Sequence, residues 1–365
     1  MRSSLWKKGI QALIIMSLLL LTACGTKEKS GNGSKNPEDL KDKVYNIKVG
    51  YSETGGAPLL DIATQEGYFK EEGVNVERVG FKNSTDGLNA LQAGKIDVGL
   101  SFGTAGPLTF IANGADFRII GGHLEGGHPI LVKKEDKDQY KTLEDFKGKK
   151  VGTIRIFTSD IVFRSALAEA GIDWEKDLNI VEFKTGGDLI QALSSGKVDA
   201  AVSANSYYAQ AVESGLVPVT WSNDLQPGHV CCRVVTREKL LKKDNGEGYK
   251  RFLKALIRAE RAKKEDPEVA IKAARQYFKG VDDKVIDSIV NEKHSNYSAD
   301  PNKKSVIKMW NQMQKIGYIK NTKDLDVNEY INIELYEKAL KELMKENPTD
   351  TYYKKLLKEF VLQDE

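Results

Sequence analysis

The chain has 365 residues, of which 40% are hydrophobic and 29% are charged, and its formal net charge is +3. Residues 1–23 contain three basic residues and no acid, so the remainder has a formal net charge of zero (3 − 3). That remainder is long enough for two hydrophobic cores, and its interspersed lysines and acids are typical of a solvated surface, so its charge gives no reason to expect nucleic-acid binding.

The N-terminal segment is typical of an export signal. Arg2, Lys7 and Lys8 precede an apolar run from residue 12 to 21, which is too short to span a membrane. The sequence LTAC at residues 21–24 resembles a bacterial lipobox, in which Cys24 is acylated and becomes the first mature residue. We therefore expect a signal peptide at residues 1–23 and a flexible tether at 24–43 that is rich in Lys, Gly, Ser and Asn. An ordinary cleaved signal or an anchor helix is the alternative.

Two stretches of the chain repeat each other. Residues 82–101 read KNSTDGLNALQAGKIDVGLS, and residues 184–203 read KTGGDLIQALSSGKVDAAVS, at an offset of 102 (184 − 82). The register continues upstream, where Val49 matches Val151. A unit of about fifty residues has therefore been used twice without a net gap.

Each copy is expected to fold as strand, helix, strand, helix, strand. A glycine, Gly94 or Gly196, follows the second helix of each copy and favours its termination there. Strands that alternate with helices indicate parallel sheets, and a period of 102 residues is far longer than that of stacked repeats. The prediction is an α/β protein with two similar lobes. Strands are expected at 47–51, 74–81, 96–100, 151–154, 178–183 and 198–202, and later helices at 248–264, 267–278, 282–291, 332–345 and 351–362.

These features together resemble the solute-binding lipoproteins of ABC importers. The resemblance rests on the lipobox, the doubled unit, the segment GYF at 67–69, the phrase LEDFKGKKVG at 143–152 and the helical final part, and it covers about residues 45–340. More narrowly, the chain is similar to the nitrate, sulfonate and taurine branch, which includes proteins that bind thiamine pyrimidine precursors.

The resemblance implies a type II periplasmic-binding-protein fold, in which two lobes joined by two crossing strands close on a ligand. The crossings are expected near 121–129 and 227–234. The implied division is 44–125 for the first part of lobe 1, 126–230 for lobe 2, and 231–365 for the return to lobe 1 with C-terminal helices. It also implies a monomer without a cofactor, anchored by lipid, such as palmitate, on Cys24 to the outer side of the bacterial cell membrane, with the permease of an ABC transporter as partner.

Polar loops follow the strands at matched positions in the two copies. In open parallel sheets, ligands bind outside the carboxyl ends of the strands, where helix N-termini present unpaired N–H groups. Helix capping is the alternative role of each loop, and Arg155 could equally form an ion pair with Glu53 across the cleft. The candidate ligand-binding residues in these loops are Ser52, Thr54, Gly55, Asn83, Ser101, Phe102, Gly103, Thr104, Arg155, Thr158, Ser159, Asn205 and Tyr207.

Histidines and cysteines gather in the expected crossings. His123, His128 and His229 lie there, and we expect ligand contact from His123 and His229. Alternation along a strand would direct His229 and Cys231 to one face and Cys232 to the other, so only Cys231 is added to the site. Burial of the cysteines as small apolar groups is the alternative, and their spacing does not favour a metal site.

The sequence contains no G-x-S-x-G elbow, no G-x-x-x-x-G-K-[ST] loop and no H-E-x-x-H helix, so hydrolase, nucleotidase and zinc-protease activities have no support. The expected function is capture of a sulfonate, nitrate or taurine-like anion, or of a small heterocycle, for an ABC permease. Two alternatives stay open. The cysteine segment lies where the similar eukaryotic thiamine-pyrimidine synthases carry a cysteine-rich motif, which leaves a related enzyme, and a ligand-sensing input protein is the other.

Overall fold

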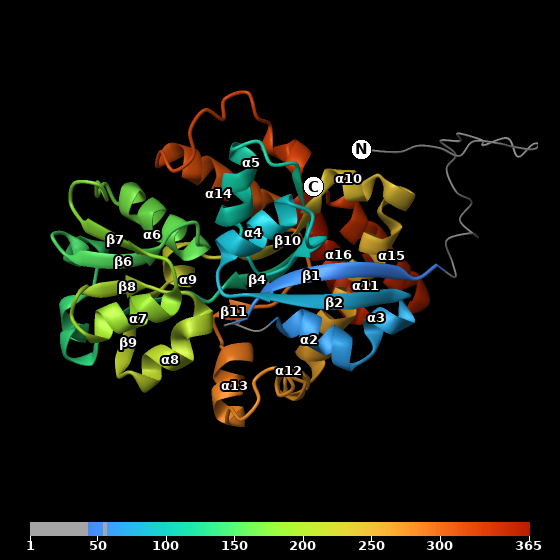
Figure 1. Ribbon diagram of the computed structural model, residues 1–365, viewed down its shortest axis with the longest axis horizontal. Helices are drawn as coiled ribbons and strands as arrows, with labels where there is room; N and C mark the ends of the chain where they lie inside the picture. Colours follow the sequence, from blue (N-terminus) through green and yellow to red (C-terminus); the bar gives the residue numbers. More distant parts are fainter. Residues whose placement is uncertain (1–42, 54–56) are drawn as a thin grey trace, which may run out of the picture. The chain divides into compact units, whose positions relative to one another are not determined.

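The protein folds into two α/β lobes that belong to one compact unit. The computed structural model describes residues 43–53 and 57–365. Each lobe is built on one β-sheet with helices on both of its faces (Figure 1). The α/β architecture with two similar lobes, predicted from the tandem repeat, is confirmed.

The first sheet has six strands in the order β11-β4-β10-β3-β1-β2. β1 pairs in parallel with β2 and β3, whereas β10 is antiparallel to β3 and β4, and β11 is antiparallel to β4. The expectation of parallel sheets therefore holds for the repeated strands only. The strands are β1 (Tyr45–Ser52), β2 (Val74–Phe81), β3 (Val98–Gly99), β4 (Phe117–Gly126), β10 (Val230–Arg237) and β11 (Ser295–Asn296).

The second sheet has five strands in the order β7-β6-β8-β5-β9, and again only the repeated strands are parallel. The chain passes from the first sheet to the second between Gly126 and Pro129 and returns between Trp221 and Val230. The strands are β5 (Pro129–Lys133), β6 (Lys150–Ile154), β7 (Asn179–Phe183), β8 (Ala200–Val202) and β9 (Leu216–Trp221).

The two copies of the repeat pair their strands in the same register. Val49 of β1 lies opposite Val98 of β3, and Val151 of β6 lies opposite Ala200 of β8, so both partners shift by 102 residues. A one-residue slip would turn every side chain to the wrong face of the sheet, so an identical register keeps the same positions buried in both lobes.

Polar positions of the repeat are duplicated as well. The carboxylate of Asp97 accepts a hydrogen bond of 3.0 Å from the backbone N–H of Lys48, and that of Asp199 accepts one of 2.8 Å from Lys150. Each carboxylate fastens the start of a third strand to the first strand of its lobe. This shared contact explains why both copies carry an aspartate at that position.

Two hydrophobic cores lie on opposite faces of the first sheet, and neighbouring residues of β4, Ile119 and Ile120, point into different ones. One face packs against α2 (Pro58–Gln65), α3 (Tyr68–Glu71), α11 (Glu247–Glu265), α12 (Glu268–Ala274), α13 (Asp283–Val290), α15 (Glu334–Glu346) and α16 (Thr351–Asp364). The other face packs against α4 (Ser84–Gln92), α5 (Ala105–Ala112) and α14 (Lys303–Lys315). Short helices α10 (Glu238–Leu241), η4 (Lys243–Gly246) and η5 (Val327–Tyr330) complete this lobe.

In the second lobe, α6 and α7 lie on opposite sides of the sheet (Figure 1). Their apolar residues form two separate cores, and Ile161 and Val162 of α6 also enter the core shared by α4, α5 and α14 of the first lobe. The helices of this lobe are η1 (Lys134–Gln139), η2 (Leu143–Phe146), α6 (Thr158–Glu169), α7 (Gly186–Ser194), η3 (Asn205–Tyr207), α8 (Tyr208–Glu213) and α9 (Ser222–Leu225).

The expected signal peptide and Cys24 lie outside the described residues, as do residues 24–42 of the expected tether. Within the part of the chain that is described, no helix combines the length and the apolar character that crossing a bilayer would need.

Arg233 of β10 has the largest fully buried side chain and ties three segments together. Among the described residues, its guanidinium donates hydrogen bonds of 2.7–3.1 Å to backbone carbonyls and to no side chain. The Glu125 carboxylate is 3.9 Å away, too far for a hydrogen bond, so it balances the charge from outside this shell. The four carbonyls belong to Leu124, Cys232, Asp300 and Pro301.

Replacement of Arg233 by methionine should lower the free energy of unfolding by about 3–5 kcal/mol, because several buried carbonyls would lose their donor. Arg155→Met is the matched control, since this side chain is 69% exposed and lies 3.5 Å from Glu182. Surface pairs contribute little, so the control should unfold like the wild type. Urea titration checks both, and equal midpoints for the two variants would contradict the structural role of Arg233.

Candidate functional site

A cavity of about 60 Å³ lies where residues of both lobes meet. A single water needs about 10–15 Å³ by this measure, so the space is several times larger than one water requires. Its wall is formed at the carboxyl ends of strands in both lobes, as predicted for open sheets. The lining residues are Ser52, Lys82, Asn83, Ser84, Ser101, Gly103, His123, Leu124, His128, Phe157, Thr158, Ala204, Asn205, Ser206, Tyr207, Cys231, Cys232 and Tyr297.

The cavity collects many of the residues singled out from the sequence. Nine of them line it: Ser52, Asn83, Ser101, Gly103, His123, Thr158, Asn205, Tyr207 and Cys231. Two more, Thr54 and Gly55, lie outside the described residues. The remaining five are placed elsewhere: Phe102, Thr104, Arg155, Ser159 and His229.

The side chains of Phe102 and Arg155 point away from the cavity in different directions, one into the core and one towards solvent. The Phe102 ring turns into the core, where its centroid lies 5.6 Å from that of Phe81 in an edge-to-face arrangement. It also fills the space next to glycine residues that have no side chain. Arg155 points outward and pairs with Glu182 of β7, so it neither lines the cavity nor pairs with Glu53. Both residues follow a strand end, as the true wall residues do. The contacts that turn their side chains away come from distant parts of the chain, so the local sequence did not reveal them.

Thr104 supports the wall from behind and links the lobes. Its hydroxyl donates to the carbonyl of Cys231 at 2.9 Å, and its N–H donates to the Thr158 hydroxyl at 3.1 Å. The Thr158 hydroxyl donates to the same Cys231 carbonyl at 2.9 Å. These buried bonds join α5, α6 and β10 beneath the cavity, and they use up the proton of the Thr158 hydroxyl.

His229 and Ser159 are buried outside the cavity wall. The Nδ1–H of His229 donates to the carbonyl of Gln226 at 2.8 Å, and its ring lies 5.8 Å from that of His128. Burial lowers the pKa of His229 to about 4, so it stays neutral near pH 7. It supports His128 from behind and has no place in the wall itself.

Both cysteines line the cavity, whereas strand alternation predicted that only Cys231 would. The pairing of β10 with β4 shifts register between Val230 and Cys232 and again between Cys232 and Arg233. Such an irregularity breaks alternation and redirects side chains. The two sulfur atoms consequently lie 3.1 Å apart on one side of the strand.

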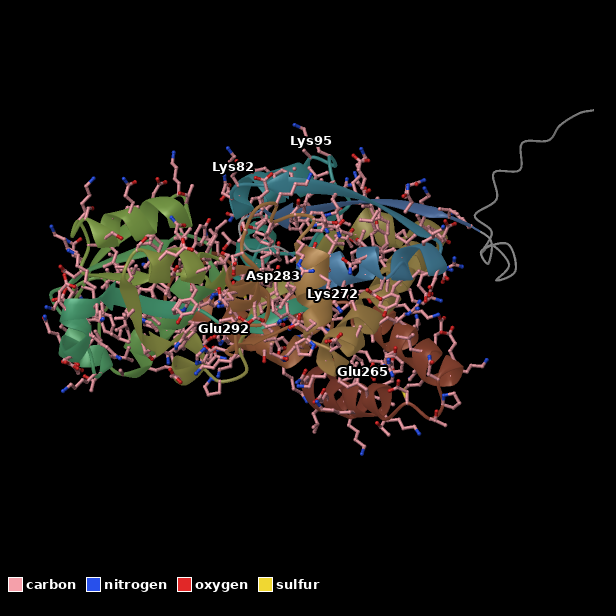
Figure 2. The ribbon with its side chains drawn as sticks, turned by 90° about the horizontal axis from the view of Figure 1, so that it is seen from below. Lys82, Lys95, Glu265, Lys272, Asp283 and Glu292 are labelled. Carbon is pink, nitrogen blue, oxygen red and sulfur yellow. The ribbon has the colours of Figure 1, made fainter. Side chains whose placement is uncertain are left out.

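Other wall residues were not among the ligand-binding residues predicted from the sequence. Tyr297 follows β11, far from the repeat, and its ring lies 5.6 Å from that of His123. Lys82 precedes α4, and Lys95 follows it. Figure 2 shows that Lys82 lies nearer to the second lobe than Lys95 does. Lys82 belongs to the repeat and could have been found there. The others are Ser84, Leu124, His128, Phe157, Ala204, Ser206 and Cys232.

Apart from Lys82, the described lining residues offer neutral groups, and none of them is a carboxylate. Burial, and then the charge of Arg233, lowers the pKa of His123 to about 3; burial, and then His229, lowers that of His128 to about 3. Both imidazoles are therefore neutral near pH 7, and each can donate one hydrogen bond and accept another.

Three buried ring nitrogens in this wall have no hydrogen-bond partner among the described residues. They are Nδ1 of His123 and both Nδ1 and Nε2 of His128. Most buried polar atoms in proteins are paired, so unpaired nitrogens on side chains that line a cavity indicate a polar molecule, solute or water, as their partner.

The pKa of His123 predicts a pH dependence of stability. As the pH falls from about 6.5 towards 3, the unfolded chain binds a proton at this position and the folded chain does not, so stability decreases by up to about 1.4 kcal/mol per pH unit. His123→Phe removes this effect. The stability of the wild type relative to the variant should therefore decrease from about pH 7.5 to about pH 5.

Urea unfolding of both proteins at each pH measures this difference. Other shifted groups, such as Glu260, whose pKa burial raises to about 7, titrate in both proteins and cancel. A difference that stays constant with pH would show that His123 is not held neutral by the fold.

Comparison with known proteins places this geometry in a family. The model of the NMT1-like family matches residues 41–276. The formylaminopyrimidine-binding protein of Halalkalibacterium halodurans is 24% identical over 194 residues, which cover 52% of this chain and 54% of that protein.

Solved structures show the same fold at low identity. The periplasmic aliphatic sulphonate binding protein SsuA of Escherichia coli superposes with a TM-score of 0.65 at 21% identity, covering 79% of this chain and 92% of that one. The periplasmic nitrate-binding protein NrtA of Synechocystis PCC 6803 gives 0.70 at 18%, covering 82% and 89%. The predicted periplasmic-binding-protein fold is confirmed. Since the family match extends over well more than half of its residues, the chain belongs to the NMT1-like family.

Proposed function

We propose that this protein is an extracytoplasmic solute-binding protein, which captures a small molecule between its lobes and delivers it to the permease of an ABC importer. The observation that carries the proposal is the cavity between the lobes, whose wall contains unpaired imidazole nitrogens and no carboxylate among its described residues. The similar proteins named for binding nitrate, a sulphonate or formylaminopyrimidine support it.

An anion is the first candidate for the solute. No carboxylate is among the described lining residues, so they do not repel negative charge, and Lys82 contributes positive potential. Hydroxyl, amide and imidazole N–H groups can bind the oxygens of a nitrate, a sulfonate or a taurine-like molecule.

A small heterocycle is the second candidate. Phe157, Tyr207 and Tyr297 line the cavity and offer ring faces and edges to a planar molecule. Neutral imidazoles can also accept a hydrogen bond from a ring N–H, which a charged side chain such as lysine cannot do. The similarity to a formylaminopyrimidine-binding protein favours the same class.

The mechanism is closure of two lobes on the solute. A solute that touches Asn83 and Ser101 of one lobe and Asn205 of the other favours the closed arrangement by its greater affinity for it, and the permease then reads that closed form. The lobe boundaries near 125 and 230, a monomeric state, the lack of enzymatic activity and lipid attachment at Cys24 are parts of the same proposal.

A thermal-shift screen tests solute capture. The chain without residues 1–24 should be stabilised by about 2.7 kcal/mol when a solute is present at a hundred times its dissociation constant. The panel contains nitrate, sulfonates, taurine, aromatic acids and pyrimidines. His123→Phe should lose most of the shift, and Arg155→Met should keep it.

The control variant and the recovered solute decide between the function classes. An equal shift in His123→Phe would contradict the assigned cavity. Nuclear magnetic resonance of the solute after incubation should show it unchanged; a converted product would replace the binding function by an enzymatic one.

Lipid attachment has its own test. The full chain expressed in a bacterium should sediment with membranes, and Cys24→Ser should release it or leave it unprocessed, because the acylated sulfur would be missing. Mass spectrometry of the N-terminal peptide measures the modification. An unmodified Cys24 in a membrane-bound wild type would contradict this part of the proposal.

A further inference from the structure

The adjacent cysteines of β10 form a dithiol that faces the cavity. Adjacent residues of a regular strand point to opposite faces, but the register shifts at Cys231 and Cys232 bring both side chains into the same wall. Their sulfurs are 3.1 Å apart, and both thiols are free. The pair is thus close enough to react internally, and it faces the cavity.

The surroundings of the two sulfurs are unequal. The hydrogen bond with Cys231 lowers the pKa of the Cys232 thiol, and a hydrogen bond from the N–H of Gly103 lowers it further. Burial raises the pKa of Cys231, and the hydrogen bond to Cys232 raises it further. The thiol of Cys232 therefore loses its proton more readily than that of Cys231.

Metal binding explains the pair less well. Among residues 43–53 and 57–365, no group of three or more His, Cys, Asp or Glu side chains is arranged to hold a metal ion. A thiolate beside a thiol and within reach of small molecules has instead the arrangement needed for thiol–disulfide exchange.

We propose that Cys231 and Cys232 are a redox modification site in the wall of the solute cavity, which a low-molecular-weight disulfide converts from a dithiol to an intramolecular disulfide. The outer side of a cell membrane, where the proposed function places the protein, is an environment in which disulfides form and persist. The oxidised pair would present no S–H group to a solute.

The chemistry proceeds in two balanced exchanges. The Cys232 thiolate attacks one sulfur of the small disulfide RSSR, a bond to Cys232 forms, and the RS–SR bond breaks to release RS⁻. This RS⁻ takes the proton of Cys231, whose thiolate then attacks the Cys232 sulfur and expels the second RS⁻, which takes up the proton that Cys232 had lost. In sum, two protein thiols and one RSSR give one protein disulfide and two RSH.

Peptide mapping of the full chain tests the proposal with cystine as the disulfide. Trypsin cleaves after Lys197 and Arg233, so both cysteines lie in the peptide 198–233, apart from Cys24. After incubation of the folded protein, this peptide should be lighter by two hydrogens, carry no adduct and resist alkylation. Both thiols remaining alkylatable, or adducts of cystine persisting on them, would overturn the proposal.

Two serine variants separate the roles of the sulfurs. Cys231→Ser should retain a half-cystine adduct on Cys232, because the thiol that would displace it is missing. Cys232→Ser should react at least tenfold more slowly, because the remaining thiol is the less acidic one. Equal reaction rates in the two variants would overturn the assignment of Cys232 as the attacking group.

The test does not depend on the folding of a variant or on the identity of the solute. Thermal unfolding of the reduced variants checks that they fold, and the wild-type peptide decides the proposal even where a variant does not. No solute enters the experiment, so its outcome is separate from that of the solute screen.

Discussion

The buried guanidinium of Arg233 is the constraint on which the candidate site depends. Through backbone carbonyls alone, it holds β10 against β4 and against the segment at residues 300–301. The two cysteines that precede it form part of the cavity wall, and His123 lies close enough for its charge to disfavour protonation of the ring. Arg233 thus fixes the strand pair and adds to the effect of burial in keeping the His123 ring neutral.

Much of the fold could be predicted because the strand–helix unit occurs twice in the sequence as a tandem repeat. A single offset of 102 residues pairs Val49 with Val151 and Asp97 with Asp199, and the structure gives both copies the same register and the same carboxylate contact. The helix α14 was not predicted, although Val306, Trp310 and Met313 are spaced for one buried face.

The site was predictable where it belongs to the repeat, and at His123 and Cys231 of the expected crossings. Asn83, Ser101 and Asn205 follow strand ends and do line the cavity. Tyr297 comes from a segment without a counterpart in the repeat, and the irregular pairing of β10 turned Cys232 into the wall against simple alternation. Such details arise from strand pairing and packing across the chain, which local sequence patterns do not contain.

A crystal structure of the protein with its bound solute tests most directly whether this cavity is the binding site. We expect a solute enclosed between the lobes, with His123 Nδ1 and His128 within hydrogen-bond distance of it and no carboxylate side chain in contact. A solute bound on another surface, or one held in the cavity by an acidic side chain while these imidazoles stay unpaired, would contradict it.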